Sequence, residues 1–289
     1  MMPDLSGLMH LVGVLIPIDS MQSLFMQKAL VGLLLLAPMT AAMGVQVVNL
    51  RMAFFSDAIS HSAFAGVALG MLFSIHPHWA MPLLGVAVGV GIVAIQRHSM
   101  LSSDTVIGVL FAAVTAMGLA LVSRAPELAR DTQTFLYGDI LTISDFDLIQ
   151  LAMLLVVLTA FETWSFNRML YICINPRLAE IHRVAVAGYQ YLFAALLALV
   201  VIFSVWAMGV LLVTALLIVP AAAARNLARS AGGMFWWAVA ISCSSAVAGL
   251  LISALPQVRT ATGATIILIA FAWFLVSFVP VAARRESAR

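Results

Sequence analysis

Residues 188–224 read GYQYLFAALLALVVIFSVWAMGVLLVTALLIVPAAAA and contain no charged side chain. A helix needs about 20 mainly apolar residues to cross the hydrocarbon core of a bilayer, so this stretch is too long for one simple crossing. A turn near Trp206–Gly209 would divide it into two shorter helices. Either both cross the membrane, or one of them is re-entrant. The stretch therefore predicts helices embedded in a membrane.

The rest of the chain repeats this pattern. Hydrophobic residues make up 64% of the sequence and charged residues only 9%, whereas soluble domains carry roughly 25% charged residues. A soluble protein could not cover its surface with so few charges. We expect an all-α polytopic transmembrane bundle, a single domain over residues 1–289, with about nine helices and a range of eight to ten. The apolar segments lie near residues 25–48, 58–75, 79–97, 104–123, 145–168, 189–205, 207–224, 232–254 and 263–282.

The arginines predict the orientation of these helices. With nine crossings, ten arginines fall on the side of the C-terminus and three on the other side. Cytoplasmic loops carry the excess of positive charge, so we expect the N-terminus outside and the C-terminus in the cytoplasm. Eight crossings would weaken the asymmetry. The ten are Arg51, Arg97, Arg168, Arg177, Arg183, Arg225, Arg229, Arg284, Arg285 and Arg289, and the three are Arg124, Arg130 and Arg259.

Two connections are longer than turns, namely residues 124–144 outside and residues 169–187 inside. In the inner one, Pro176 suits the first position of a short helix, and Leu178 and Ile181 recur at helical spacing. Two interpretations stay open for this segment: a surface loop resting among lipid headgroups, or a docking element for a cytoplasmic partner. Its candidate docking residues are Pro176, Arg177, Glu180 and Arg183.

The sequence lacks the motifs of several enzyme classes. It has no GxxxxGK[ST] motif, because its only lysine, Lys28, is followed by alanine, so the chain cannot hold nucleotide phosphates in a P-loop. It has no GxSxG or HExxH motif either. We expect no enzymatic activity, no permanently bound cofactor and no nucleic-acid partner. The two cysteines, Cys173 and Cys243, are expected to be free thiols.

The strongest candidate site is the pair Asp57 and His61 at the start of the second apolar segment. Ionisable residues inside a membrane are costly, and their default interpretation is functional. Residues four apart share one face of a helix, and carboxylate and imidazole groups both bind zinc, while a carboxylate also suits manganese. The structural alternative is that Asp57 caps the helix and His61 is an interior histidine.

Two ligands are too few for a selective site, because zinc usually takes four. A twofold homodimer would bring two Asp57 and two His61 side chains around one axis. Gly66 and Gly70 follow on the same helix with the spacing of small residues at membrane helix contacts. We therefore expect this helix to pack closely against a neighbour.

Other polar residues in the apolar segments have structural interpretations. Asp104 is expected to cap a helix, and Glu162 to pair with Arg168 or to extend toward the membrane surface. His76 and His78 lie in a short outer turn and are expected to be solvated, with contact to incoming metal as the alternative.

Residues 51–70, RMAFFSDAISHSAFAGVALG, resemble the signature of the zinc/manganese/iron permease family of ATP-binding-cassette importers. Three further stretches resemble this family in the same order. They are residues 135–141 (FLYGDIL), 209–224 (GVLLVTALLIVPAAAA) and 263–268 (GATIIL).

The resemblance implies a permease homodimer in the inner membrane of a bacterium, a cytoplasmic ATPase subunit that hydrolyses ATP, and an extracytoplasmic metal-binding protein. It also implies that Asp57 and His61 bind the transported divalent metal and that residues 175–188 dock on the ATPase. The alternatives from other classes are an ion-coupled secondary transporter, which often shows inverted repeats, and a metal-dependent membrane enzyme. The sequence does not separate zinc from manganese or iron.

Overall fold

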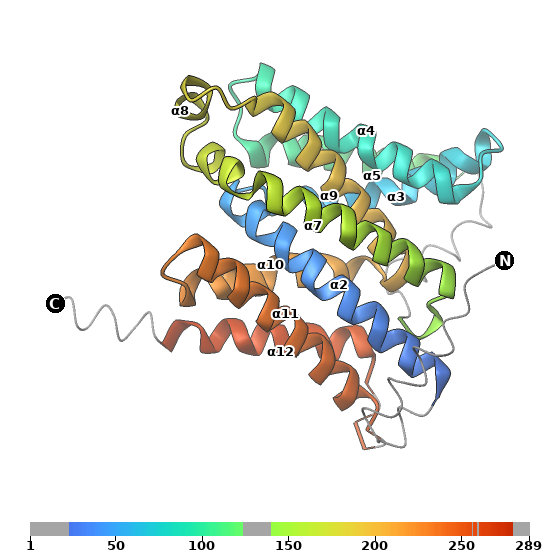
Figure 1. Ribbon diagram of the computed structural model, residues 1–289. Helices are drawn as coiled ribbons and strands as arrows, with labels where there is room; N and C mark the ends of the chain where they lie inside the picture. Colours follow the sequence, from blue (N-terminus) through green and yellow to red (C-terminus); the bar gives the residue numbers. More distant parts are fainter. Residues whose placement is uncertain (1–22, 124–139, 256, 259, 280–289) are drawn as a thin grey trace. The chain divides into compact units, whose positions relative to one another are not determined.

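The computed structural model describes residues 23–123, 140–255, 257–258 and 260–279, and the elements in these residues are helices (Figure 1). The predicted outer connection, apart from its last residues, and the match at residues 135–139 lie outside the described residues. The helices are α2 (Leu24–Asn49), α3 (Phe55–Leu72), α4 (Pro77–His98), α5 (Ser103–Val122), η2 (Ile140–Thr142), α7 (Asp145–Ile174), α8 (Pro176–Ile181), α9 (Val186–Met208), α10 (Val210–Leu227), α11 (Ala231–Ser253) and α12 (Thr262–Val276).

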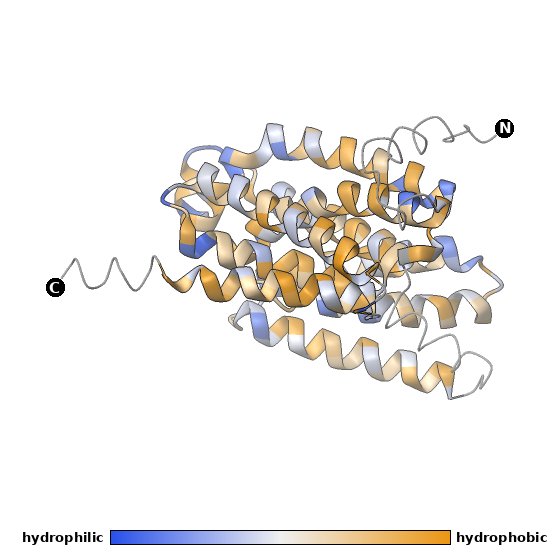
Figure 2. Cartoon of the chain, turned by 90° about the horizontal axis from the view of Figure 1, so that it is seen from below, coloured by the Kyte–Doolittle hydropathy of each residue, from blue (hydrophilic) through white to orange (hydrophobic). Residues whose placement is uncertain are grey.

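The long helices coincide with the nine predicted apolar segments, which confirms the all-α polytopic prediction. Seven of those described, α2, α4, α5, α7, α9, α10 and α11, are long and apolar enough to cross a membrane. The helix α12 has only 15 residues, and α3 carries Asp57, His61 and three serines along its 18 residues. Figure 2 shows apolar residues along the helices and hydrophilic residues mainly near their ends. The orientation inferred from the arginines stays a prediction.

The long apolar stretch is divided at Gly209, as the sequence suggested. Gly209 has a φ of 86°, a conformation that glycine adopts without the steric cost of a side chain. The helix α9 ends at Met208 and α10 begins at Val210. Each is long and apolar enough for a crossing of its own.

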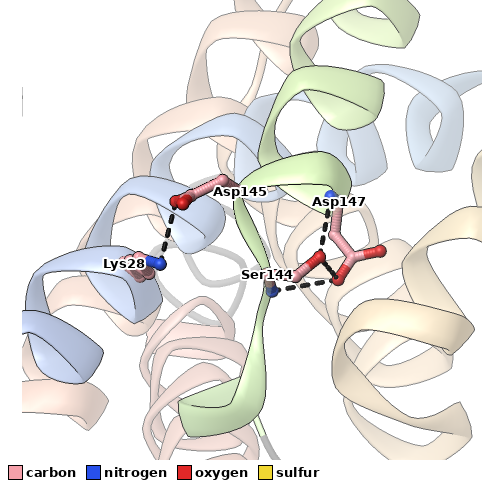
Figure 3. Close-up of polar contacts among 4 residues, drawn as sticks. All are labelled: Lys28, Ser144, Asp145 and Asp147. Carbon is pink, nitrogen blue, oxygen red and sulfur yellow. Dashed lines mark hydrogen bonds and ion pairs between the residues drawn. The ribbon is translucent and has the colours of Figure 1, made fainter. Parts of the chain in front are cut away.

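Short polar side chains fix several helix starts. The Ser102 hydroxyl accepts the Thr105 N–H at 3.2 Å, and the Ser230 hydroxyl accepts the Gly233 N–H at 3.1 Å. At α7, the Ser144 hydroxyl accepts the Asp147 N–H at 3.2 Å, and an Asp147 carboxylate oxygen accepts the Ser144 N–H at 3.0 Å (Figure 3). This reciprocal pair is a capping box.

Contacts divide the chain into two compact units. Unit 1 comprises Met1–Gly44, Tyr137–Val156 and Ala207–Arg289, and unit 2 comprises Val45–Leu136 and Val157–Trp206. The prediction of one domain over residues 1–289 stays a prediction.

Unit 1 contains α10, α11, α12 and the first parts of α2 and α7. Its helices approach at glycines: a Cβ added at Gly44 of α2 would lie 1.9 Å from the Leu217 carbonyl oxygen of α10. A Cβ at Gly249 of α11 would lie 2.7 Å from the Ile266 Cα of α12. Lys28 of α2 and Asp145 of α7 form an ion pair at 2.9 Å (Figure 3).

Unit 2 contains the end of α2, all of α3, α4, α5 and α8, most of α9 and the second part of α7. Here α4 packs closely against α9: a Cβ added at Gly85 would lie 2.7 Å from the Ile202 Cγ1. The Arg97 guanidinium of α4 also donates to the Gln190 side-chain oxygen of α9 at 2.8 Å. The helix α3, which carries the candidate metal ligands, belongs wholly to this unit.

Candidate metal site on helix α3

Asp57 and His61 both lie on α3, which begins at Phe55. The residue at the N-cap position is Phe54, and no side chain caps this end. Asp57 lies in the first turn, so the interpretation of Asp57 as a capping residue is wrong. The two residues are four apart within a regular helix and therefore share one face.

This face of α3 differs from the rest of the helix in its burial. Asp57, His61 and Phe64 recur at helical spacing and are only partly buried. Most of the remaining residues as far as Gly70 are buried. The carboxylate and the imidazole are therefore presented from the side of α3 that the chain itself leaves partly open.

Two neighbouring helices hold α3 in place. Toward α4, a Cβ at Gly66 would lie 2.9 Å from the Met81 Cα, and a Cβ at Gly70 would lie 2.9 Å from the Ala80 Cβ. Toward α5, a Cβ at Gly118 would lie 3.2 Å from the Phe64 ring. Small residues let helices approach closely, so Gly66, Gly70 and Gly118 allow the close contacts of α3 with its two neighbours.

The His61 imidazole packs against the ring of Phe111 on α5. The ring centroids are 4.9 Å apart and the planes are inclined at 89°, which is the edge-to-face arrangement that aromatic pairs favour. This contact restricts the orientation of the imidazole. Nothing in the sequence singled out Phe111, because it lies fifty residues away in an apolar segment of similar composition.

The ligand atoms of the pair are available for a cation. Among the described residues, no hydrogen bond or short ion pair engages the Asp57 carboxylate or the His61 ring nitrogens. That part of the chain also holds no group of three or more histidine, cysteine, aspartate or glutamate side chains able to bind a metal ion. One chain therefore offers a carboxylate and an imidazole, which is an incomplete ligand set for zinc.

The predicted inner segment contains the short helix α8. It begins at Pro176, as the sequence predicted, and the Asn175 side-chain oxygen accepts the backbone N–H groups of Arg177 and Leu178 at 3.0 and 3.2 Å. The helix ends at Ile181 and so includes both apolar positions, Leu178 and Ile181, that recur at helical spacing. The helix α7 continues to Ile174, so the connection between the two long helices is shorter than residues 169–187.

The exposed surface of α8 has both charged and apolar side chains. Leu178 is 48% exposed and Ile181 is 76% exposed, whereas Ala179 is buried. The predicted docking residues Pro176, Arg177, Glu180 and Arg183 are all exposed. Arg183 follows the helix with a φ of 59°, which turns the chain toward α9.

Both structural interpretations of Glu162 are corrected. Glu162 does not pair with Arg168 and does not extend to the membrane surface, because it is buried and accepts a hydrogen bond from Gln46. Arg168 instead donates to the Tyr189 hydroxyl and stacks on the Trp164 and Tyr189 rings.

Two further candidates lie at helix starts. The cap of α5 is Ser102 rather than Asp104, which lies in the first turn. The His76 ring nitrogen Nδ1 accepts the His78 N–H at the start of α4 at 3.3 Å. Neither position brings a third ligand to Asp57 and His61 within the described residues.

Comparison with known proteins gives relatives along almost the whole chain. The sequence is 30% identical over 244 residues to the high-affinity zinc uptake system membrane protein ZnuB of Haemophilus influenzae, which covers 84% of this chain and 93% of ZnuB. It is 32% identical over 255 residues to the manganese import system permease protein ScaB of Streptococcus gordonii, which covers 88% of this chain and 90% of ScaB.

A solved structure and a family model agree with these relatives. The structure of PsaBC from Streptococcus pneumoniae in complex with Fab superimposes with a TM-score of 0.75 at 27% identity, covering 92% of this chain and 93% of that chain. The model of the ABC 3 transport family matches residues 22–280. The resemblance seen in residues 51–70 is thereby confirmed: the chain belongs to the ABC 3 transport family and is a multi-pass membrane permease of the bacterial plasma membrane.

Proposed function

We propose that this chain is the membrane subunit of an ATP-driven importer of a divalent transition metal, zinc or manganese. The metal crosses through a site built from Asp57 and His61. The observation that carries the proposal is the pair itself: a carboxylate and an imidazole on a partly open face of a helix whose residues as far as Gly70 are mostly buried. The relatives named for zinc uptake and manganese import support this class of substrate.

The number of ligands favours a homodimer. One chain supplies a carboxylate and an imidazole, while a zinc site usually has four ligands. A second copy related by a twofold axis doubles the set, because each copy contributes the same two residues. The partly open face of α3 is the face that such an axis requires.

The ATPase is a separate subunit in this proposal, because the chain has no P-loop. The exposed residues Leu178 and Ile181 of α8, flanked by Arg177 and Glu180, support docking of that subunit at α8. An extracytoplasmic metal-binding protein delivers the ion to the chain on the side of the membrane opposite to the ATPase. Closure of the ATPase subunits moves α8 and changes the side of the membrane to which the metal site opens.

The test is metal uptake into proteoliposomes that contain the chain, its ATPase and its binding protein. We expect Asp57→Ala and His61→Ala each to abolish most uptake of zinc and manganese. Asp104→Ala and His98→Ala are matched controls, since both change exposed residues of neighbouring helices, and they are expected to leave uptake unchanged. Wild-type uptake by either site variant, or uptake by the chain alone without ATP, would contradict the proposal.

A further inference from the structure

A second polar pair lies inside unit 2 and does not include the residues assigned to metal transport. Gln46 of α2 donates from its side-chain nitrogen Nε2 to Glu162 Oε2 of α7 at 3.3 Å. Gln46 is fully buried and Glu162 is 6% exposed. The two residues are 116 positions apart in the sequence, so the fold brings them together.

Each side chain has one oxygen that the hydrogen bond leaves unused. Among the described residues, neither Glu162 Oε1 nor Gln46 Oε1 has a hydrogen-bond partner, and both atoms are buried. Ser165, one turn further along α7, is also buried, and its hydroxyl has no partner in that part of the chain. Buried polar atoms are nearly always partnered in folded proteins, and an exception calls for an explanation such as a bound ion.

The charge of this pair is not balanced by the chain. No lysine, arginine or histidine nitrogen of the described residues lies within 4.0 Å of the Glu162 carboxylate. Arg168, the basic residue nearest in sequence, is turned to the Tyr189 hydroxyl and the Trp164 ring.

The position of Glu162 makes this imbalance costly. The protein covers this residue almost completely, because only 6% of it is exposed. An ionised carboxylate with one long hydrogen bond is strongly disfavoured in such surroundings. Water could donate hydrogen bonds to the two free oxygens, but it would supply no positive charge.

We propose that Glu162 Oε1 and Gln46 Oε1 together bind a small cation that neutralises the buried carboxylate. A proton and a metal ion both satisfy this chemistry. A proton on Oε1 forms an O–H that donates to Gln46 Oε1, and with the existing N–H···O bond this closes a ring of two hydrogen bonds between the acid and the amide. A metal ion would be held by a carboxylate and an amide oxygen, which are ligands that manganese and other hard divalent ions accept.

The inference does not rest on the metal role of Asp57 and His61, and the two can fail separately. The purified full chain in nanodiscs is compared with Glu162→Gln, which keeps an amide at the position of the carboxyl and its hydrogen bond to Gln46. Infrared difference spectra report the protonation of the carboxyl. Manganese content after equilibration with the metal alone, measured with and without a chelator, reports metal binding.

Two results support the proposal and identify the cation. If it is a proton, the wild type shows the C=O band of a protonated carboxyl that Glu162→Gln lacks, and the chelator does not change it. If it is a metal ion, Glu162→Gln loses bound manganese that Asp57→Ala retains. Asp104→Asn, an exposed acid on α5, is expected to change neither signal.

A second variant keeps the test independent of the folding of Glu162→Gln. Gln46→Met retains the carboxyl and removes the amide, so the band of the acid shifts to the higher frequency of a free carboxyl, or manganese binding weakens. The proposal is overturned if Glu162 is an ionised carboxylate without bound metal. It is also overturned if Glu162→Gln leaves both signals equal to those of the wild type.

Discussion

Replacing Gly44 with alanine tests the close contact between α2 and α10 within unit 1. The new Cβ would lie 1.9 Å from the Leu217 carbonyl oxygen, whereas ordinary contact begins at 3.4 Å, so the helices must part locally by about 1.5 Å. Overpacking of a core costs about 1–3 kcal/mol, and a clash with backbone belongs at the upper end. Alanine is about 1 kcal/mol more favourable than glycine inside a helix, which offsets part of this loss of stability. We expect a net loss of about 2 kcal/mol, or roughly 5 °C in melting temperature.

The assay heats the full chain in detergent to a series of temperatures and measures the folded fraction by size-exclusion chromatography with fluorescence detection. Gly108→Ala and Gly91→Ala are matched controls, since a Cβ at either position would meet no described atom within 4 Å. These variants gain helix propensity without a clash and should be at least as stable as the wild type. If Gly44→Ala melted at the same temperature as these controls, the contact with Leu217 would not have the energetic importance assigned to it.

Three other predictions follow from single contacts. Phe111→Ala removes the ring that orients His61 and should weaken metal binding about tenfold, or about 1.4 kcal/mol, by titration calorimetry; unchanged affinity would show that the contact does not position the ligand. Ile181→Asp places a charge on an exposed apolar position of α8 and should abolish copurification with the ATPase, whereas full recovery of the complex would place docking elsewhere. Ser144→Ala should lower the free energy of unfolding by about 1 kcal/mol, because α7 loses its helix cap. Lys28→Met should lower it by less, because the ion pair with Asp145 is partly exposed. A larger loss for Lys28→Met than for Ser144→Ala in thermal unfolding would contradict this ranking.

The helices were predictable because the membrane imposes a simple rule on the sequence. A segment that must satisfy its backbone groups in hydrocarbon has to be helical and apolar for about 20 residues, so length and composition locate each one. The break near Gly209 was also predictable, because residues 188–224 are too long for one crossing and glycine adopts a positive φ without steric cost. The end of α7 was predicted six residues too early, because Asn167 and Arg168 interrupt the apolar segment, although residues 169–174 (MLYICI) continue the helix.

The contacts of the polar residues were harder to predict. The placement of Asp57 and His61 on one face follows from helical spacing alone, because both residues lie on one helix. The partner of Glu162 does not, since Gln46 is 116 residues away and a nearby arginine offered a plausible local partner. The same limit applies to Phe111 and His61, which meet only because α3 and α5 pack together.

The polar character of α3 is itself an argument for where its open face must point. The helix carries Asp57, His61 and three buried serines and is not among the seven helices apolar enough to cross a membrane. A helix of this composition is tolerated in a bilayer only if protein or a water-filled path surrounds its polar groups. The neighbours α4 and α5 cover much of its surface, and the face with Asp57 and His61 stays partly open. Lipid would penalise both side chains on that face, so we expect it to meet a second copy of the chain or the path of the cation.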